Sequence, residues 1–260
     1  MVTTCHFKIF KSLLAADLKI FYEQLKDKVI DVFIWVAITL VVMAYIMPSF
    51  GLVDYGTFQL AGLVASAGLF ELWPSVMGLV TDFENDRIIS FHLILPIKPS
   101  IVLLKTLCFY ALNACFLGLL VIPMGKIILW NQFDLTLMSL FQTLIIITLS
   151  GIFYGIFTLW IASRIPNLSK VGNVWMRFIF PMWFLGGFQF SWYALYGIVP
   201  YLAYLNMLNP MNVVMEGTRA ALLGPDGYLP FWLSVGVLSL FNVLCWVDAY
   251  RRLKKRLDFV

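Results

Sequence analysis

The chain has 260 residues, of which 62% are apolar and 12% are charged, whereas soluble globular domains have roughly 45–50% and about 25%. Because so little polar surface is left to face water, this composition excludes a cytosolic enzyme, a disordered tail and a secreted disulfide scaffold. The 23 Phe, 11 Tyr and 9 Trp are typical of a helical membrane protein with aromatic residues at both membrane interfaces. The net charge of +4 is small, so the distribution of charge along the chain is more informative.

Residues 1–28 are predicted to form an amphipathic helix that lies in the cytoplasmic membrane interface. Apolar residues recur there at spacings of three and four, and lysines fall largely between them. The apolar face would lie in the acyl chains, with the lysines towards anionic headgroups. This helix is either a membrane anchor or a docking surface for a cytosolic partner, and both roles can hold.

A bilayer core of about 30 Å needs roughly 20 apolar residues of helix to cross it. Six segments meet this requirement: 29–47, 57–80, 100–122, 135–162, 174–190 and 229–247. The expected breaks between them carry prolines, namely Pro48, Pro96, Pro99, Pro123, Pro166 and Pro225. The predicted fold is therefore an all-α polytopic membrane protein, with a six-span transmembrane domain over 29–248 and a basic tail over 249–260.

Six spans place both termini on one side of the membrane, and the basic residues indicate which side. Of the 18 Lys and Arg, only Lys126 and Arg219 fall on the side opposite the termini. Cytoplasmic loops of membrane proteins carry the excess of Lys and Arg. Both termini are therefore predicted to be cytoplasmic.

The cytoplasmic connection 81–92 is predicted to contain a short helix. Thr81 and Glu84 match the S/T-x-x-E capping box, and acidic residues such as Asp82 suit the first turn of a helix. The face of this helix is aromatic and charged, with residues at four-residue spacing: Phe83, Arg87 and Phe91. Any connection can contain one capped turn, but this surface favours a binding site for a cytosolic protein.

The segment 192–224, between the last two predicted spans, suggests a re-entrant hairpin on the outer side. Asn209 and Pro210 are an N-cap followed by proline, and Gly224 ends the predicted helix. Its 14 residues would reach only about 21 Å, which is too short to cross. Glu216 and Arg219, three residues apart, can pair and so reduce the cost of immersion. The hairpin either caps the bundle or closes the outer mouth of a pathway.

Glu71 is the one acidic residue well inside a predicted span, so a place in a transport pathway and a structural partner are both open. Neither a metal-binding spacing of His and acidic residues nor a P-loop is present. The sequence Gly125-Lys126 is followed by Ile127 and does not fit G-x-x-x-x-G-K-[ST]. Any ATP-driven work must therefore come from another chain.

The order of these features resembles the membrane (permease) subunit of a type 2 ATP-binding-cassette (ABC-2-type) exporter. The most specific stretches are DFENDR at 82–87 with LPI at 95–97, and LNPM at 208–211 followed by EGTRAALLG at 216–224. The resemblance covers essentially the whole chain and implies a non-catalytic subunit that binds no cofactor itself. A separate ATPase subunit would hold ATP and Mg, and a second permease copy would face the first across the pathway.

The resemblance also assigns roles to residues. The ATPase would seat on a coupling helix that includes Thr81, Asp82, Phe83, Glu84, Arg87 and Phe91. The outer gate hairpin would include Asn209, Pro210, Glu216, Arg219 and Gly224. The expected function is export of a lipid-like, drug-like or glycolipid amphiphile from the bacterial inner membrane, with membrane lipids but no nucleic acid as partners. Export of a polysaccharide such as O-antigen is the alternative in the same family, and an ion-coupled carrier or an intramembrane enzyme is the alternative of another class.

Overall fold

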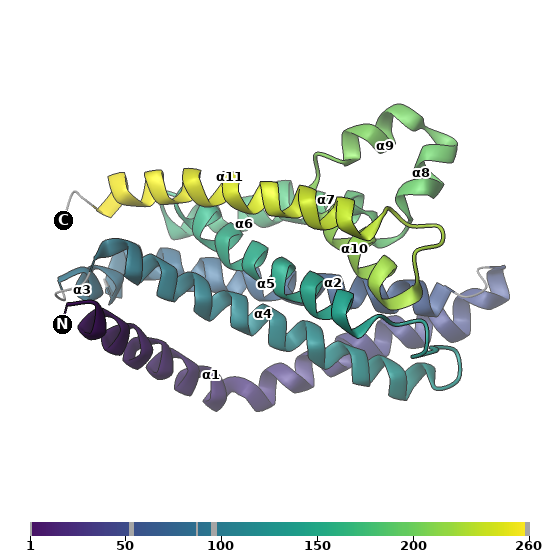
Figure 1. The fold of residues 1–260 in the computed structure, drawn as a ribbon, viewed down its shortest axis with the longest axis horizontal. Coiled ribbons are helices and arrows are strands. Elements are labelled where there is room, and N and C mark those ends of the chain that lie inside the picture. Colours follow the sequence, from purple (N-terminus) through teal and green to yellow (C-terminus); the bar gives the residue numbers. More distant parts are fainter. Residues whose placement is uncertain (1, 52–54, 87, 95–97, 258–260) are drawn as a thin grey trace.

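The computed structural model describes residues 2–51, 55–86, 88–94 and 98–257, and this part of the chain contains helices and no strand (Figure 1). Five of its helices are long and apolar enough to cross a membrane: α1 (Val2–Val41), α2 (Tyr55–Thr81), α4 (Pro99–Leu129), α5 (Leu140–Ala162) and α11 (Phe231–Leu257). The predicted all-α class is confirmed, and these apolar helices support the predicted transmembrane character.

The predicted span 174–190 is not one long α-helix. Pro181 has no N–H to donate to the carbonyl four residues earlier, which interrupts the α-helical register. Gly187, with φ of 87°, ends the helical series. The segment consists of a 3₁₀ turn at Leu168–Lys170, α6 (Val171–Val174), a π-helical turn at Trp175–Ile179, α7 (Phe180–Trp183) and a second π-helical turn at Phe184–Phe188. The predicted number of six spans is therefore not confirmed.

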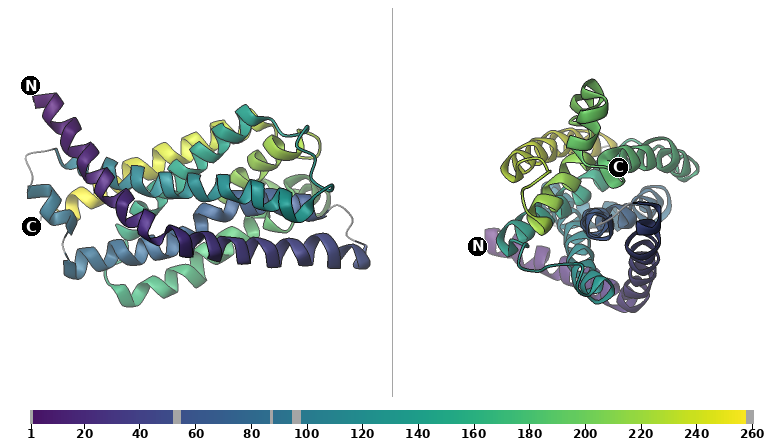
Figure 2. Two further views of the ribbon diagram at one scale, coloured as in Figure 1. Left: turned by 90° about the horizontal axis from the view of Figure 1, so that it is seen from below. Right: turned by 90° about the vertical axis from the view of Figure 1, so that its right-hand side faces the viewer.

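A helix continues through three other predicted boundaries. Helix α1 has no break between residues 28 and 29, since it contains neither proline nor glycine; it bends along its length instead (Figure 2). Helix α4 continues through Pro123, as membrane helices can where neighbouring groups satisfy the freed carbonyl. Helix α11 includes most of the predicted basic tail and extends to Leu257.

The core centres on α2 and α5, which both pack against α4 and against α10 (Pro210–Leu223). Residues 211–222 of α10 are all buried, and α2, α5 and α11 surround this helix. Small residues let α5 approach α4 closely: a Cβ placed on Gly155 would lie 2.7 Å from the Leu107 carbonyl oxygen. A Cβ on Gly151 would likewise lie 2.9 Å from the Ala111 carbonyl oxygen, so both glycines allow the close contact of the two helices.

The described ends of the chain and α3 (Ile88–Ile94) lie at one end of the bundle (Figures 1 and 2). The segment 168–188 runs along the bundle beside the long helices and returns the chain to the opposite end. There α8 (Trp192–Ile198) and α9 (Pro200–Asn206) project outward. Hereafter the two ends are called the terminal end and the hairpin end.

Candidate functional site

Helix α10 has the bounds that its sequence predicts, and its first residue is Pro210 and its last is Leu223. The Asn209 side-chain oxygen accepts a hydrogen bond from the Met211 N–H at 3.0 Å and so caps the helix. Gly224 follows with φ of 97°, a conformation that disfavours a side chain. The predicted N-cap, N1 proline and C-terminal glycine are therefore confirmed.

Glu216 and Arg219 of α10 form an ion pair, with Arg219 Nη1 at 3.2 Å from Glu216 Oε1. Both side chains are fully buried. Removing two charges from water is costly unless each has further hydrogen bonds. The predicted pairing is confirmed, and the hydrogen bonds that accompany it come from three other parts of the chain.

The Glu216 carboxylate accepts two backbone hydrogen bonds besides the one from Arg219. The Trp192 N–H, at the start of α8, donates to Oε1 at 3.1 Å. The Leu229 N–H, in the connection to α11, donates to Oε2 at 3.0 Å. One carboxylate therefore joins α10 to the start of α8 and to the connection that precedes α11.

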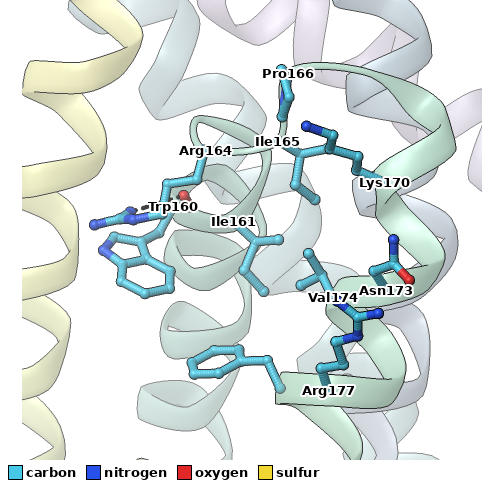
Figure 3. A pocket seen from close by; sticks show the side chains of 10 residues that line it. Trp160, Ile161, Arg164, Ile165, Pro166, Lys170, Asn173, Val174 and Arg177 are labelled. Carbon is cyan, nitrogen blue, oxygen red and sulfur yellow. Dashed lines mark hydrogen bonds between the residues drawn. The ribbon is translucent and has the colours of Figure 1, made fainter.

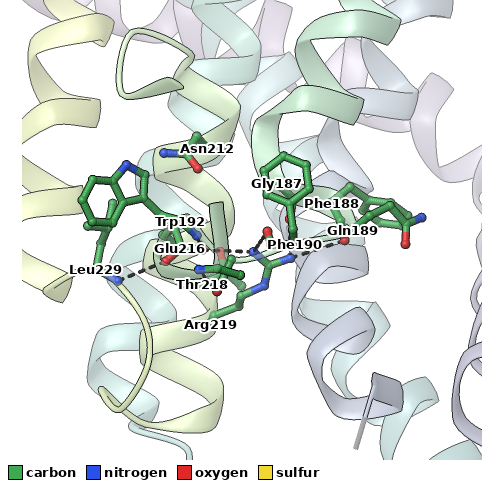
Figure 4. A network of polar contacts seen from close by, with 12 residues as sticks. Gly187, Phe188, Gln189, Phe190, Trp192, Asn212, Glu216, Thr218, Arg219 and Leu229 are labelled. Carbon is green, nitrogen blue, oxygen red and sulfur yellow. Dashed lines mark hydrogen bonds and ion pairs between the residues drawn. The ribbon is translucent and has the colours of Figure 1, made fainter. Parts of the chain in front are cut away.

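The Arg219 guanidinium binds the end of the segment 168–188 (Figure 4). Nη2 donates to the Gly187 carbonyl at 2.6 Å, and Nη1 donates to the Phe190 carbonyl at 3.3 Å. The guanidinium also lies 3.7 Å from the centroid of the Phe58 ring of α2, a cation–π geometry. These carbonyls are available because the helical series ends at Gly187.

Residues of α2 extend this set of contacts. Gln59 Nε2 donates to the Phe188 carbonyl at 3.1 Å and to Gln189 Oε1 at 3.0 Å, and the Tyr55 hydroxyl donates to the Gln189 carbonyl.

We call Glu216, Arg219 and the backbone groups that they bind the α10 network. It links α10, the end of the segment 168–188, α8 and the connection that precedes α11. Moving any of these segments alone would leave a buried charge or amide without a partner.

The capping box predicted at the start of the coupling segment is wrong. Helix α2 extends through Thr81 and continues into a π-helical turn at Asp82–Asp86, so Thr81 does not begin a helix. Asp82 is the cap of α3 instead: its carboxylate oxygens accept hydrogen bonds from the Ile88 N–H at 2.7 Å and the Ile89 N–H at 3.0 Å. A buried aspartate therefore fixes the start of α3 to the end of α2.

The other predicted coupling residues differ in their surroundings. The Arg256 guanidinium lies 4.6 Å from the centroid of the Phe83 ring. The Glu84 carboxylate accepts a hydrogen bond from the Leu168 N–H, at 3.3 Å from each oxygen. Phe91 is 63% exposed, whereas Arg87 lies outside the described residues. The sequence does not single out Ile88, which is 53% exposed beside Phe91 on α3.

Glu71 has a structural partner, because its carboxylate pairs with the Lys28 ammonium of α1. A second ion pair, between Asp17 of α1 and the buried Lys105 of α4, has a separation of 2.6 Å. Both pairs fasten α1 to the bundle. A place for Glu71 in a transport pathway remains a prediction.

Among the described residues, no group of three or more His, Cys, Asp or Glu is arranged to hold a metal ion. Comparison of the chain with protein-family models and with curated proteins finds no match. The function is therefore inferred from the two ends of the bundle, namely α3 at the terminal end and the α10 network at the hairpin end.

Proposed function

We propose that this chain is the membrane-spanning permease subunit of a type 2 ATP-binding-cassette exporter in the bacterial inner membrane. The terminal end faces the cytosol, and the segment 168–188 is the sixth crossing. A separate ATPase subunit holds ATP and Mg, and two permease copies flank the pathway. The cargo is an amphiphile of the lipid, drug or glycolipid type. The main support is that α3 exposes two apolar side chains at the end where the basic residues concentrate.

Helix α3 is suited to receive mechanical force because it is fixed to several elements. Asp82 ties it to α2, while the neighbouring Phe83 and Glu84 contact α11 and the start of the segment 168–188. Exposed Ile88 and Phe91 fit an apolar cleft on a partner. A displacement of α3 would therefore move the terminal ends of α2, α11 and the segment 168–188 together.

The α10 network is suited to be the outer gate of the same device. Its two buried charges hold four segments in one arrangement. Buried polar groups tolerate a second arrangement only if all find new partners together. We therefore expect the hairpin end to open as a unit when the long helices tilt, with the re-entrant segment 192–224 moving as one body.

The docking role of α3 can be tested by replacing Ile88 and Phe91 together with Asp. Tagged wild-type protein, extracted from native membranes in mild detergent, should capture a P-loop ATPase. The double variant should lose on the order of tenfold or more of this capture, because two carboxylates would have to enter an apolar cleft.

A matched control removes two exposed apolar side chains at the hairpin end, through Tyr201→Asp and Leu208→Asp. This variant should capture the ATPase as the wild type does. Equal capture by the α3 variant, or no ATPase bound to the wild type, would contradict the proposal.

An ion-coupled carrier is the second candidate, and the Lys28–Glu71 pair is the observation that favours it. Ionisable residues within spans often mark ion pathways. Purified protein in vesicles, without an ATPase, could be given a proton gradient and a fluorescent phospholipid analogue. Gradient-driven movement that is lost in Glu71→Gln would favour the carrier, whereas the exporter predicts no movement.

A further inference from the structure

A groove of about 630 Å³ lies between the end of α5 and the segment 168–178 (Figure 3). Its floor is apolar, because Ile161 and Ile165 are buried there. The rings of Trp160 and Phe178 border the groove, with their centroids 6.2 Å apart. Since α5 is long and apolar enough to span a membrane, a groove at its end lies at the depth of lipid headgroups.

Three cations border this groove, and none of its lining residues is acidic. Arg164 is already engaged: it pairs with Asp248 of α11 and lies 3.6 Å from the centroid of the Trp160 ring. Lys170 and Arg177 are exposed, and neither has an acidic partner among the described residues. Both side chains line the same groove, so two cations without acidic partners face it from the segment 168–178.

A second groove, of about 440 Å³, continues from the first and shares Arg177 and Phe178 with it. It follows α7 towards the hairpin end, and its lining is mostly apolar, including Leu185, Leu202 and Leu205. The two grooves together place a positively charged site at one end of an apolar track. This combination matches a molecule with an anionic head and a hydrocarbon chain.

We propose that Lys170 and Arg177 bind the phosphate of an anionic membrane phospholipid, with an acyl chain lying along α7 in the second groove. Lys and Arg are the usual partners of phosphate oxygens. A second copy of the chain is a poorer occupant, because twofold pairing through this face would bring like charges together. The inference goes beyond the proposed transport, since it requires only that the chain lies in a bilayer.

The test is native mass spectrometry of the purified chain in detergent, titrated with phosphatidylglycerol or with phosphatidylcholine of the same acyl chains. The wild type should bind the anionic lipid on the order of tenfold more tightly. Lys170→Gln with Arg177→Gln should remove this preference. Lys254→Gln with Lys255→Gln, which removes two exposed cations of α11 at the same end, should retain it.

A second pair of variants tests the acyl-chain track. Leu185→Asn with Leu205→Asn should weaken binding of long-chain phosphatidylglycerol several-fold, whereas Leu240→Asn with Leu244→Asn, equally exposed on α11, should not. Equal affinity for the two headgroups, displacement of the lipid by inorganic phosphate alone, or a Lys170/Arg177 variant that changes the oligomeric state would each overturn the inference. None of these outcomes bears on capture of an ATPase by α3.

Discussion

Arg219 is the largest fully buried side chain in the described part of the protein, and most of its hydrogen bonds go to backbone carbonyls. Gly187, Phe188 and Phe190 supply these carbonyls, and Glu216 supplies the opposite charge. Carbonyls at the end of a helical segment carry partial negative charge. A cation at this point therefore stabilises both the carboxylate and the end of the segment 168–188. A neutral hydrogen-bond donor would stabilise them less.

Replacing Arg219 with Gln should destabilise the protein by about 3–5 kcal/mol, the usual cost of leaving one partner of a buried ion pair uncompensated. Arg219→Lys should recover only part of this, because an ammonium does not reproduce the planar fork of donors. Denaturant unfolding in detergent micelles gives the free energies. Arg251→Gln, which alters an exposed cation, should change stability by about 0.5 kcal/mol or less. Equal effects of Arg219→Gln and Arg251→Gln would contradict the network.

His92 of α3 should make the terminal end sensitive to pH. Partial burial and the positive charge of Lys105 lower the pKa of His92, and the negative charges of Asp17 and Asp82 oppose this only in part. A histidine with a lowered pKa in the fold contributes stability above its unfolded pKa of about 6.5, and this contribution is lost as pH falls below that value. The unfolding free energy of the wild type should therefore fall between pH 7 and pH 5 by more than that of His92→Gln. Identical pH profiles would show that His92 does not take part.

Only the local part of the site could be predicted from the sequence. The Glu216–Arg219 pair and the Asn209 cap depend on spacings of two or three residues, which a helix fixes by its geometry. Trp192 and Leu229, whose N–H groups complete the network, belong to segments that the fold brings to α10. Adjacent Gly186 and Gly187 are a local signal that a helix ends at this point and leaves backbone carbonyls free.

At the scale of the elements, a helix was predicted correctly where strong signals mark both of its ends. Helix α10 has a cap, a proline and a glycine, and its bounds agree with prediction. The prediction that a capping box at Thr81 begins a helix is wrong, because no signal ends α2 before this residue and the helix continues through it. The segment 174–190 was predicted as one span because hydropathy does not show that Pro181 and Gly187 divide it.

Replacement by alanine should have opposite effects on stability at two glycines, one at the contact between α4 and α5 and one in open space on α2. Gly155→Ala should destabilise the protein by about 1–3 kcal/mol, because the new Cβ would meet the backbone of Leu107 and Ala111. Gly78→Ala in α2, where no atom lies within 4 Å, should be neutral or stabilising by up to about 1 kcal/mol. Unfolding free energies measured in the same micelle compare the two variants. Equal changes would show that α4 and α5 do not approach each other at Gly155.

At the scale of the whole molecule, the chain runs back and forth so that α3 and the described chain ends share one end of the bundle (Figure 1). Alternating apolar segments predicted this arrangement, because each span reverses the direction of the chain. The close packing of α10 inside the bundle could not be predicted, since its sequence has no more than a short amphipathic pattern. The proposed mechanism needs both features. The terminal end must offer the ATPase a rigid contact, and the hairpin end must form a buried gate from several linked segments.

The most direct test of this mechanism is the sidedness of the two ends, because only a cytosolic α3 can meet an ATPase. Single cysteines can be placed at exposed Asn131, in the connection between α4 and α5, and at exposed Ser169, at the terminal end. The native cysteines Cys5, Cys108, Cys115 and Cys245 are first replaced by Ala. In intact spheroplasts, a membrane-impermeant maleimide should label Asn131→Cys at once and Ser169→Cys only after permeabilisation. The reverse pattern, or labelling of both positions from outside, would contradict the account.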